Sequence, residues 1–328
     1  MMRAFGRFLG RALLILAALG VTAWLFGPYE PSSQQPSRSF DPGLDLDAYF
    51  AGVEAAYDDI TPGTAKRVVW AGATGETTDW VVVYVHGFSA TSEEIRPVPD
   101  KVAEGLGANL IYTRLAGHGR GPDAMSEPAA QDWVDDLAEA MAAARAAGDR
   151  ILIISTSTGG TIVTALAQNE DVIAGTAGLI FVSPNYGLNN PAANLLSWPG
   201  ARYWLPPLAG AQRSFEPLNA QHGTYWTTEY ASVAVMPMVA LIDTVANMDH
   251  GATNIPALFY YSDDDKVVRP DVTAQVAAAW GAPTAIVHPE LSAGDDPYDH
   301  VIAGDILSPG QTDAAVAAML DWARTLPE

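Results

Sequence analysis

The chain has 328 residues, no cysteine and a formal net charge of -21. Hydrophobic residues make up 49% of it, which is enough to form a large buried core. Such an acidic chain repels phosphate, so the composition argues against nucleic acid as a partner. Without cysteine the chain has no disulfide bonds and no thiol chemistry, and a metal site would need histidine and carboxylate ligands alone.

Residues 1–27 have the composition of a targeting segment. Three arginines come before an apolar run at 12–27, and no acidic residue occurs before Glu30. This pattern predicts either an uncleaved membrane anchor or a signal peptide that is removed near Ala23. We favour the anchor because the apolar run continues past Ala23. In both cases the remainder of the chain is expected on the extracytoplasmic side.

Residues 28–44 are rich in Pro, Ser and Gln, which predicts a linker between the membrane segment and a domain over 45–328. Apolar residues recur at helical spacing in 45–60, so a surface helix is expected there. An edge strand is expected at 66–70.

Strands and helices then alternate up to residue 169. Continuous apolar runs in the strands are typical of a sheet that is covered on both faces. The alternation predicts an α/β fold with a doubly wound, mostly parallel sheet and right-handed crossovers. The expected strands are 79–88, 109–113 and 151–154. The expected helices are 93–105, 133–147 and the segment after 158. The first of these helices has its proper start near Asp100.

The stretch 155–160, Ser-Thr-Ser-Thr-Gly-Gly, follows one of these strands. Its small residues permit a sharp strand-to-helix turn that would present Ser157 at the carboxyl end of the sheet. This is the G-x-S-x-G nucleophile elbow with Ser155 in place of the first glycine. An ordinary glycine-rich loop, or a phosphate site at a helix N-terminus, is the alternative.

The strand at 79–88 breaks at a His-Gly pair. The glycine lets the backbone turn over the end of the sheet, which would point the Phe88 N–H toward the space above Ser157. Together with the Thr158 N–H it would give two donors for a developing oxyanion. We interpret His86 as a brace for this loop.

After a strand at 178–184 the regular alternation stops. Residues 185–255 contain many aromatic side chains and three methionines. An insertion of this length predicts a lid of short helices with an apolar underside. Alternatively, these aromatic side chains only pack the insertion onto the domain.

The last part of the chain resumes the core. Three adjacent acids at 263–265 usually indicate a solvated turn, and a metal site there lacks a second ligand cluster. Strands are expected at 257–261 and 284–288, helices at 271–280 and 312–326, and a loop at 297–301.

A serine hydroxyl becomes a good nucleophile when a histidine, oriented by a carboxylate, takes its proton. Ser157, an acid after a later strand and a histidine after the last strand have the chain order expected of such a set on a parallel sheet. His300 is the best base because it lies in a loop near the end of the chain, and His288 is the alternative. His222 and His250 lie within the expected lid and would move with it.

The motifs HGF, RLAGHG, S-x-S-x-G-G, SDDDKVV and DHV occur in this order. With them the chain resembles the α/β-hydrolase superfamily over about residues 65–325, and within it the carboxylesterase and monoacylglycerol-lipase-like branch. The acid of that family precedes x-V-V, so the resemblance implies Asp265 as the acid, with Asp263 as the alternative. It also implies oxyanion donors from Phe88 and Thr158, an acyl-enzyme intermediate and no cofactor.

These features predict a serine hydrolase of carboxylic esters that acts through Ser157, Asp265 and His300. An apolar lid and a membrane segment favour monoacylglycerol-like or other amphiphilic esters, with short-chain and medium-chain esters close behind. A peptidase, thioesterase or acyltransferase on the same fold is the alternative. A non-catalytic binder is disfavoured because it has no use for all three side chains.

Overall fold

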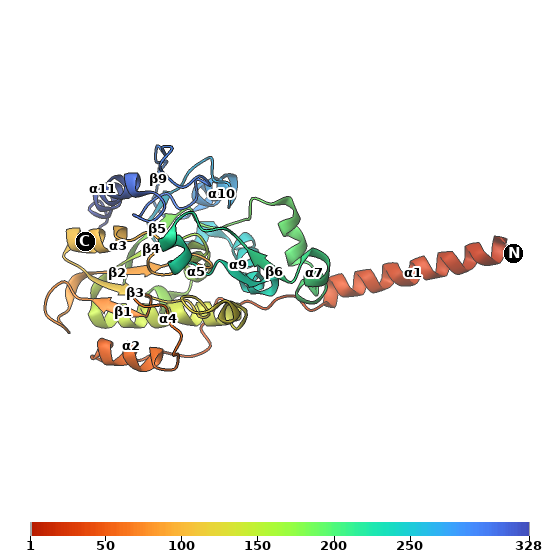
Figure 1. Ribbon diagram of the computed structural model, residues 1–328, viewed down its shortest axis with the longest axis horizontal. Helices are drawn as coiled ribbons and strands as arrows, with labels where there is room; N and C mark the ends of the chain where they lie inside the picture. Colours follow the sequence, from red (N-terminus) through yellow and green to blue (C-terminus); the bar gives the residue numbers. More distant parts are fainter. Residues whose placement is uncertain (1, 328) are drawn as a thin grey trace.

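A seven-stranded sheet forms the centre of the domain (Figure 1). The computed structural model describes residues 2–327. Neighbouring strands are parallel except at one edge, where β1 pairs antiparallel with β3, so the predicted α/β class is confirmed. The strands, in their spatial order, are β1 (Arg67–Val69), β3 (Asn109–Tyr112), β2 (Thr78–Val85), β4 (Gly148–Thr156), β5 (Thr176–Val182), β8 (Ala257–Tyr260) and β9 (Thr284–Val287).

Side chains of the central strands alternate between two hydrophobic cores. In β2, Val81 and Val83 pack into one core, and Val82 and Tyr84 pack into the other. Helices α4, α5 and α10 cover the first face, and α3 and α11 cover the second (Figure 1). Both faces are thus buried, which explains the continuous apolar runs. These helices are α3 (Val98–Leu106), α4 (Ala130–Ala147), α5 (Thr158–Leu166), α10 (Pro270–Ala279) and α11 (Thr312–Ala323), with the short α6 (Glu170–Ile173) after α5.

The first helix of the domain is shorter than expected. α2 spans Leu46–Glu54 and so ends before residue 60. Tyr57 has left the helix, and its ring centroid lies 4.9 Å from the Arg114 guanidinium carbon and 4.4 Å from that of Arg120. These cation–π contacts favour the early end of the helix.

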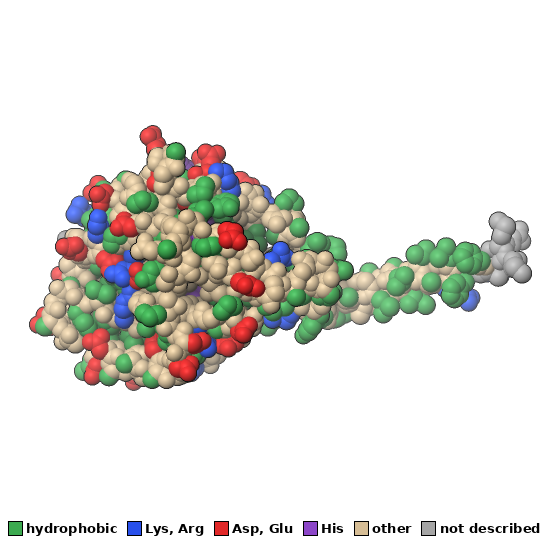
Figure 2. Space-filling view, in the orientation of Figure 1, with side chains coloured by type: hydrophobic (Ala, Val, Ile, Leu, Met, Phe, Trp, Pro, Cys, Tyr) green, Lys and Arg blue, Asp and Glu red, His purple; other side chains and the backbone are tan. Residues whose placement is uncertain are grey.

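α1 (Met2–Phe26) projects from the domain as one long helix (Figure 1). Its span Phe5–Phe26 contains an 18-residue window that has a mean hydropathy of 1.9 and is not buried against the domain. This length is sufficient to cross the hydrocarbon core of a bilayer, which takes about 20 residues. Figure 2 shows hydrophobic side chains along this helix and charged side chains scattered over the domain. A helix of this kind near the N-terminus is either a membrane anchor or a signal sequence.

Residues 28–44 connect α1 to the domain with almost no regular structure, and they lie against its surface. Glu30 forms an ion pair with Arg202. The Ser37 amide donates to Asp135 Oδ1 at 2.7 Å. Polar contacts and the Phe40 side chain, which packs against the main core, therefore hold this segment on the domain.

Residues 185–255 form short helices, as expected, and also an antiparallel strand pair that the sequence did not indicate. The strands are β6 (Gln212–Ser214) and β7 (Glu229–Ala231). The last α-helix of this segment, α9, packs against α5 and buries Met238 and Leu241 in the main core, so this part of the insertion belongs to the packed domain. The helices are η2 (Pro191–Ser197), α7 (Ala201–Ala209), α8 (Ala220–Tyr225), η3 (Ser232–Val235), α9 (Met236–Ala246) and η4 (His250–Ala252).

Candidate active site

Ser157 occupies a sharp turn between β4 and α5. Its backbone has φ 50° and ψ -117°, a conformation that is strained for a residue other than glycine. The Ser157 amide donates to Val182 O at 3.0 Å, and its carbonyl accepts from the Asn185 amide at 3.0 Å. Contacts from β5 and the loop that follows it therefore hold the strained turn in place.

Small residues around Ser157 make this turn possible. A Cβ on Gly159 would lie 2.2 Å from Val85 O, closer than any side chain can approach a backbone oxygen. Ser155 remains within β4 and donates to Ile180 O at 3.2 Å. The positive φ falls on Ser157 and not on Ser155, so a serine fits at 155 without backbone strain.

The three predicted side chains form one hydrogen-bonded chain. His300 Nε2 lies 3.0 Å from Ser157 Oγ, and His300 Nδ1 lies 2.7 Å from Asp265 Oδ2. With the ring proton on Nδ1, the imidazole donates to the carboxylate and Nε2 accepts from the serine hydroxyl. All three residues are more than nine-tenths buried. The fold thus joins side chains that are up to 143 positions apart in the sequence.

Backbone amides fix both ends of the acid–histidine pair. Asp265 Oδ1 accepts from the amides of Val267 and Val268 at 2.8 and 2.9 Å, which leaves Oδ2 for the imidazole. The His300 amide donates to Asp296 Oδ2 at 3.2 Å. Asp265 follows β8 and His300 follows β9, so both side chains lie at the carboxyl end of the sheet, as Ser157 does.

The site stabilises the protonated form of His300. Burial by itself lowers the pKa of this imidazole, because the cation loses solvation. The adjacent Asp265 carboxylate outweighs that effect, Glu94 and Asp296 add to it, and the pKa is raised above its ordinary 6.5. The imidazolium is the state that a general base reaches once it has taken a proton.

The alternative residues lie apart from this hydrogen-bonded chain. Asp263 Oδ1 is 3.8 Å from His288 Nδ1, and the Asp263 side chain is largely exposed whereas that of His288 is 43% exposed. Within residues 2–327, neither forms a hydrogen bond with Ser157. His222 and His250 pack against tryptophan rings. The positions of these four residues therefore do not favour Asp263 over Asp265 as the acid, or any of the three histidines over His300 as the base.

The two amides expected to bind an oxyanion lie beside Ser157. A Cβ built on Gly87 would be 3.1 Å from Ser157 Cβ, so the turn that carries the Phe88 amide closely approaches the serine. Thr158 follows the serine directly at the N-terminus of α5. Neither the Phe88 N–H nor the Thr158 N–H donates a hydrogen bond to any residue that the structure describes.

Two buried histidines hold the neighbouring loops. His86 Nε2 accepts from the Leu115 amide at 3.1 Å, in keeping with the brace that the sequence indicated. His118 Nδ1 lies 3.0 Å from Ala116 O. Burial lowers the pKa of His118 to about 4 and holds that of His86 well below its usual value, so both rings are neutral near pH 7.

Sequence reasoning missed two acids of the site. Asp296 Oδ2 accepts from the amides of both His300 and Val301, and the acid-rich stretch before His300 was a signal for it. Glu94 lies buried behind Gly87. The helix expected at 93–105 begins only at Val98, so Glu94 lies in an irregular turn before α3 and no helical periodicity marked it.

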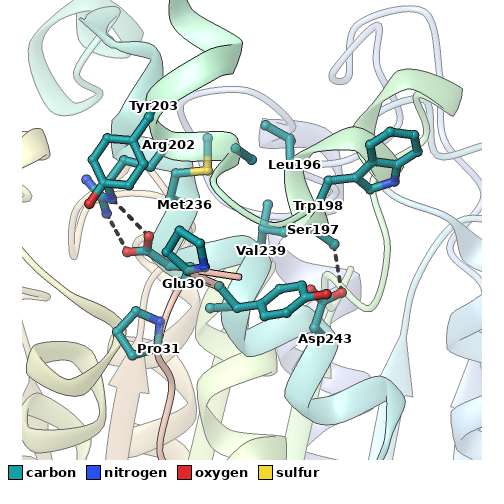
Figure 3. A pocket seen from close by; sticks show the side chains of 14 residues that line it. Glu30, Pro31, Leu196, Ser197, Trp198, Arg202, Tyr203, Met236, Val239 and Asp243 are labelled. Carbon is teal, nitrogen blue, oxygen red and sulfur yellow. Dashed lines mark hydrogen bonds and ion pairs between the residues drawn. The ribbon is translucent and has the colours of Figure 1, made fainter. Parts of the chain in front are cut away.

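A cavity of about 290 Å³ lies where the N-terminal segment meets the insertion (Figure 3). Its wall includes the Glu30–Arg202 ion pair and a 2.9 Å hydrogen bond from Ser197 to Asp243. None of the three hydrogen-bonded site residues lines it, so this cavity is distinct from the candidate active site. Within residues 2–327 no group of three or more His, Asp or Glu side chains is arranged to hold a metal ion.

Comparison with known proteins agrees with this geometry. The family model described as serine aminopeptidase, S33, matches residues 76–288. The chain belongs to this family. The part of this S33 chain that matches the model contains Ser157 and Asp265 and ends before His300.

The S33 chain is also similar to lipolytic enzymes. It is 28% identical over 189 residues to the thermostable monoacylglycerol lipase of Bacillus sp. (strain H-257), which covers 58% of this chain and 72% of that protein. A solved structure from LipS and LipT, two metagenome-derived lipolytic enzymes, has a TM-score of 0.65 at 21% identity and covers 81% of this chain and 99% of its own. The Paleococcus ferrophilus monoacylglycerol lipase has a TM-score of 0.55 at 12% identity, with 78% and 96% covered.

These likenesses confirm the α/β-hydrolase fold, in the carboxylesterase and monoacylglycerol-lipase-like branch. The S33 chain is accordingly a hydrolase.

Proposed function

We propose that this chain hydrolyses carboxylic esters with Ser157 as nucleophile, His300 as general base and Asp265 as the acid that orients the imidazole. The observation that carries the proposal is the hydrogen-bonded chain from Ser157 Oγ through both His300 nitrogens to Asp265, with distances of 3.0 and 2.7 Å. Such a chain turns a weakly nucleophilic hydroxyl into an efficient attacking group.

In the proposed reaction, Ser157 Oγ attacks the acyl carbon while His300 Nε2 takes its proton. The carbonyl oxygen becomes an oxyanion and accepts hydrogen bonds from the Phe88 and Thr158 amides, whose N–H groups are otherwise unused within residues 2–327. His300 then gives its proton to the leaving alkoxide, and an acyl-enzyme remains. Water, deprotonated by His300, attacks the acyl carbon of the acyl-enzyme. As the bond to Ser157 Oγ breaks, His300 returns that proton to Oγ, and the acid product leaves the regenerated serine.

We propose that the part of the insertion before α9 covers this site as a lid. Ser157 is only 6% exposed. The Thr227 amide donates to Ser89 O at 2.7 Å, and the Tyr230 ring packs edge-on against Phe88 at 5.2 Å. These contacts seat the insertion on the loop that carries the oxyanion amide, and an aromatic cover of this kind suits substrates with an acyl chain.

Amphiphilic esters are the substrates we favour, monoacylglycerols among them, with short-chain and medium-chain esters next. The lipolytic relatives support this order. The family description, serine aminopeptidase, supports amide cleavage as the second candidate. The same hydrogen-bonded chain could act on either bond, and the leaving group distinguishes the two reactions.

A substrate panel tests the proposed function. The purified full chain is given p-nitrophenyl esters from acetate to palmitate, a monoacylglycerol series and aminoacyl p-nitroanilides at the same pH. We expect ester hydrolysis with a higher kcat/KM than any anilide, because the aromatic cover suits acyl chains. Faster cleavage of the anilides would reverse the order of the two candidates.

We further propose that α1 anchors the domain to a membrane, with the catalytic part on the extracytoplasmic side. After cell fractionation, the full chain is expected in the membrane pellet, retained through an alkaline wash and released by detergent, because 22 consecutive residues of high hydropathy favour the bilayer. External protease should digest the domain in spheroplasts and leave a cytoplasmic control protein intact. Recovery of a soluble chain that begins near Ala23 would instead identify a cleaved signal peptide.

A further inference from the structure

Glu94 is a buried carboxyl group that the proposed reaction does not use. The residue is 2% exposed, although no positively charged side chain pairs with it within residues 2–327. Its Oε2 accepts from the Gly87 amide at 2.7 Å and from the Tyr84 hydroxyl at 3.0 Å. Burial of an acid is costly, so its retention in a core position calls for a specific role.

The position of Glu94 relates it directly to the nucleophile. A Cβ built on Gly87 would lie 2.7 Å from Glu94 Oε1 and 3.1 Å from Ser157 Cβ. The carboxyl group and the serine therefore flank the same backbone carbon. By accepting the Gly87 N–H, Glu94 also holds the turn from which the next amide, that of Phe88, is presented.

The charge of Glu94 acts on the base. Burial raises the pKa of Glu94 to about 7. The hydrogen bonds from the Gly87 amide and the Tyr84 hydroxyl and the charge of His300 lower this pKa, but burial is the larger effect. In return, the Glu94 carboxylate is one of three acids, with Asp265 and Asp296, that raise the pKa of His300. The charges on Glu94 and His300 therefore influence one another.

We propose that Glu94 is a positioning residue of this active site, which holds the Gly87–Phe88 turn beside Ser157 and whose negative charge stabilises the imidazolium of His300. The inference rests on the proposed function, because it assigns Glu94 a part in the same reaction. The two effects are separable: the first needs a hydrogen-bond acceptor at this position, and the second needs a charge.

Glu94→Gln separates the two effects. The amide oxygen can still accept the Gly87 N–H, but the charge is gone. The reaction requires neutral His300, so kcat/KM falls as the pH drops through the pKa of that imidazole. Without the carboxylate this pKa is lower, and we expect the acid limb of the pH profile to move down by about half to one pH unit. At high pH, kcat should change little.

Two further variants complete the experiment. Glu94→Asp keeps the charge but withdraws the acceptor, so its acid limb should stay close to that of the wild type while kcat at high pH falls about tenfold through misplacement of the turn. Glu93→Gln is the matched control, since the Glu93 carboxylate pairs with Arg96 and Arg67 and does not touch Gly87. Its pH profile should coincide with that of the wild type.

The outcomes separate this inference from the proposed function. A folded wild type that hydrolyses no ester and reacts with no fluorophosphonate would contradict the proposed function. If the wild type is active and Glu94→Gln has the same acid limb in its pH profile, the inference alone is overturned. The inference is also overturned if the acid limb of Glu94→Asp shifts as far as that of Glu94→Gln. If Glu94→Gln does not fold, Glu94→Asp decides: an unchanged limb with reduced kcat supports the inference, and a shifted limb contradicts it.

Discussion

Replacement of Ser157 by alanine should abolish ester hydrolysis, with a loss in kcat of roughly a millionfold. The alanine has no Oγ to attack the acyl carbon, so no acyl-enzyme forms. Substrate binding and the two oxyanion amides would remain, which leaves a small rate above that in water. The change is also expected to relieve little strain, because alanine still carries a Cβ at the positive φ of 50°.

Two measurements on this variant check the expectation. The first is kcat with the best ester of the panel, and the second is covalent labelling by a fluorophosphonate, which wild type should show and Ser157→Ala should lack. Ser155→Ala is a suitable control, because that hydroxyl donates to Ile180 O within the sheet and lies outside the hydrogen-bonded chain. It should keep nearly full activity and lose about 1 kcal/mol of stability. Undiminished labelling of Ser157→Ala would refute the nucleophile.

Replacement of Asp265 by asparagine should lower kcat by about ten-thousandfold. The Val267 and Val268 amides both donate to Oδ1, so the asparagine oxygen is expected to stay there and its NH2 group to face the imidazole. An NH2 group can only donate to Nδ1. His300 must then carry its proton on Nε2, where it cannot accept from the serine hydroxyl.

Asp263→Asn is the matched control for this variant, because it makes the same chemical change two residues earlier. The Asp263 side chain is exposed and its nearest histidine is His288, at 3.8 Å. We expect its kcat to equal that of the wild type. Steady-state kinetics of both variants at a pH well above the acid limb give the comparison, and thermal unfolding shows whether each is folded. A large loss in Asp263→Asn, or none in Asp265→Asn, would show that Asp265 does not orient the base.

Local sequence patterns were sufficient for most of the fold. The continuous apolar runs of β2 and β4 predicted strands buried on both faces, and the alternation with helices predicted the parallel sheet. The elbow around Ser157 was also predictable, because the small residues after β4 act on the backbone within a few positions of themselves. These signals depend on residues that are close together in the sequence, so they can be recognised without the tertiary structure.

Other features depend on contacts between distant parts of the chain. The sequence favoured His300 over His288 by its loop position, and the family resemblance favoured Asp265 over Asp263, but neither could show which pair lies beside Ser157. Only the path of the loops after β8 and β9 brings Asp265 and His300, and not Asp263 and His288, into line with Ser157. The burial of Glu94 beside Gly87 likewise arises from tertiary packing, because nothing in its neighbours in the chain marks it as a core residue. Residue type and periodicity specify elements, whereas distances of about 3 Å between side chains depend on how those elements pack.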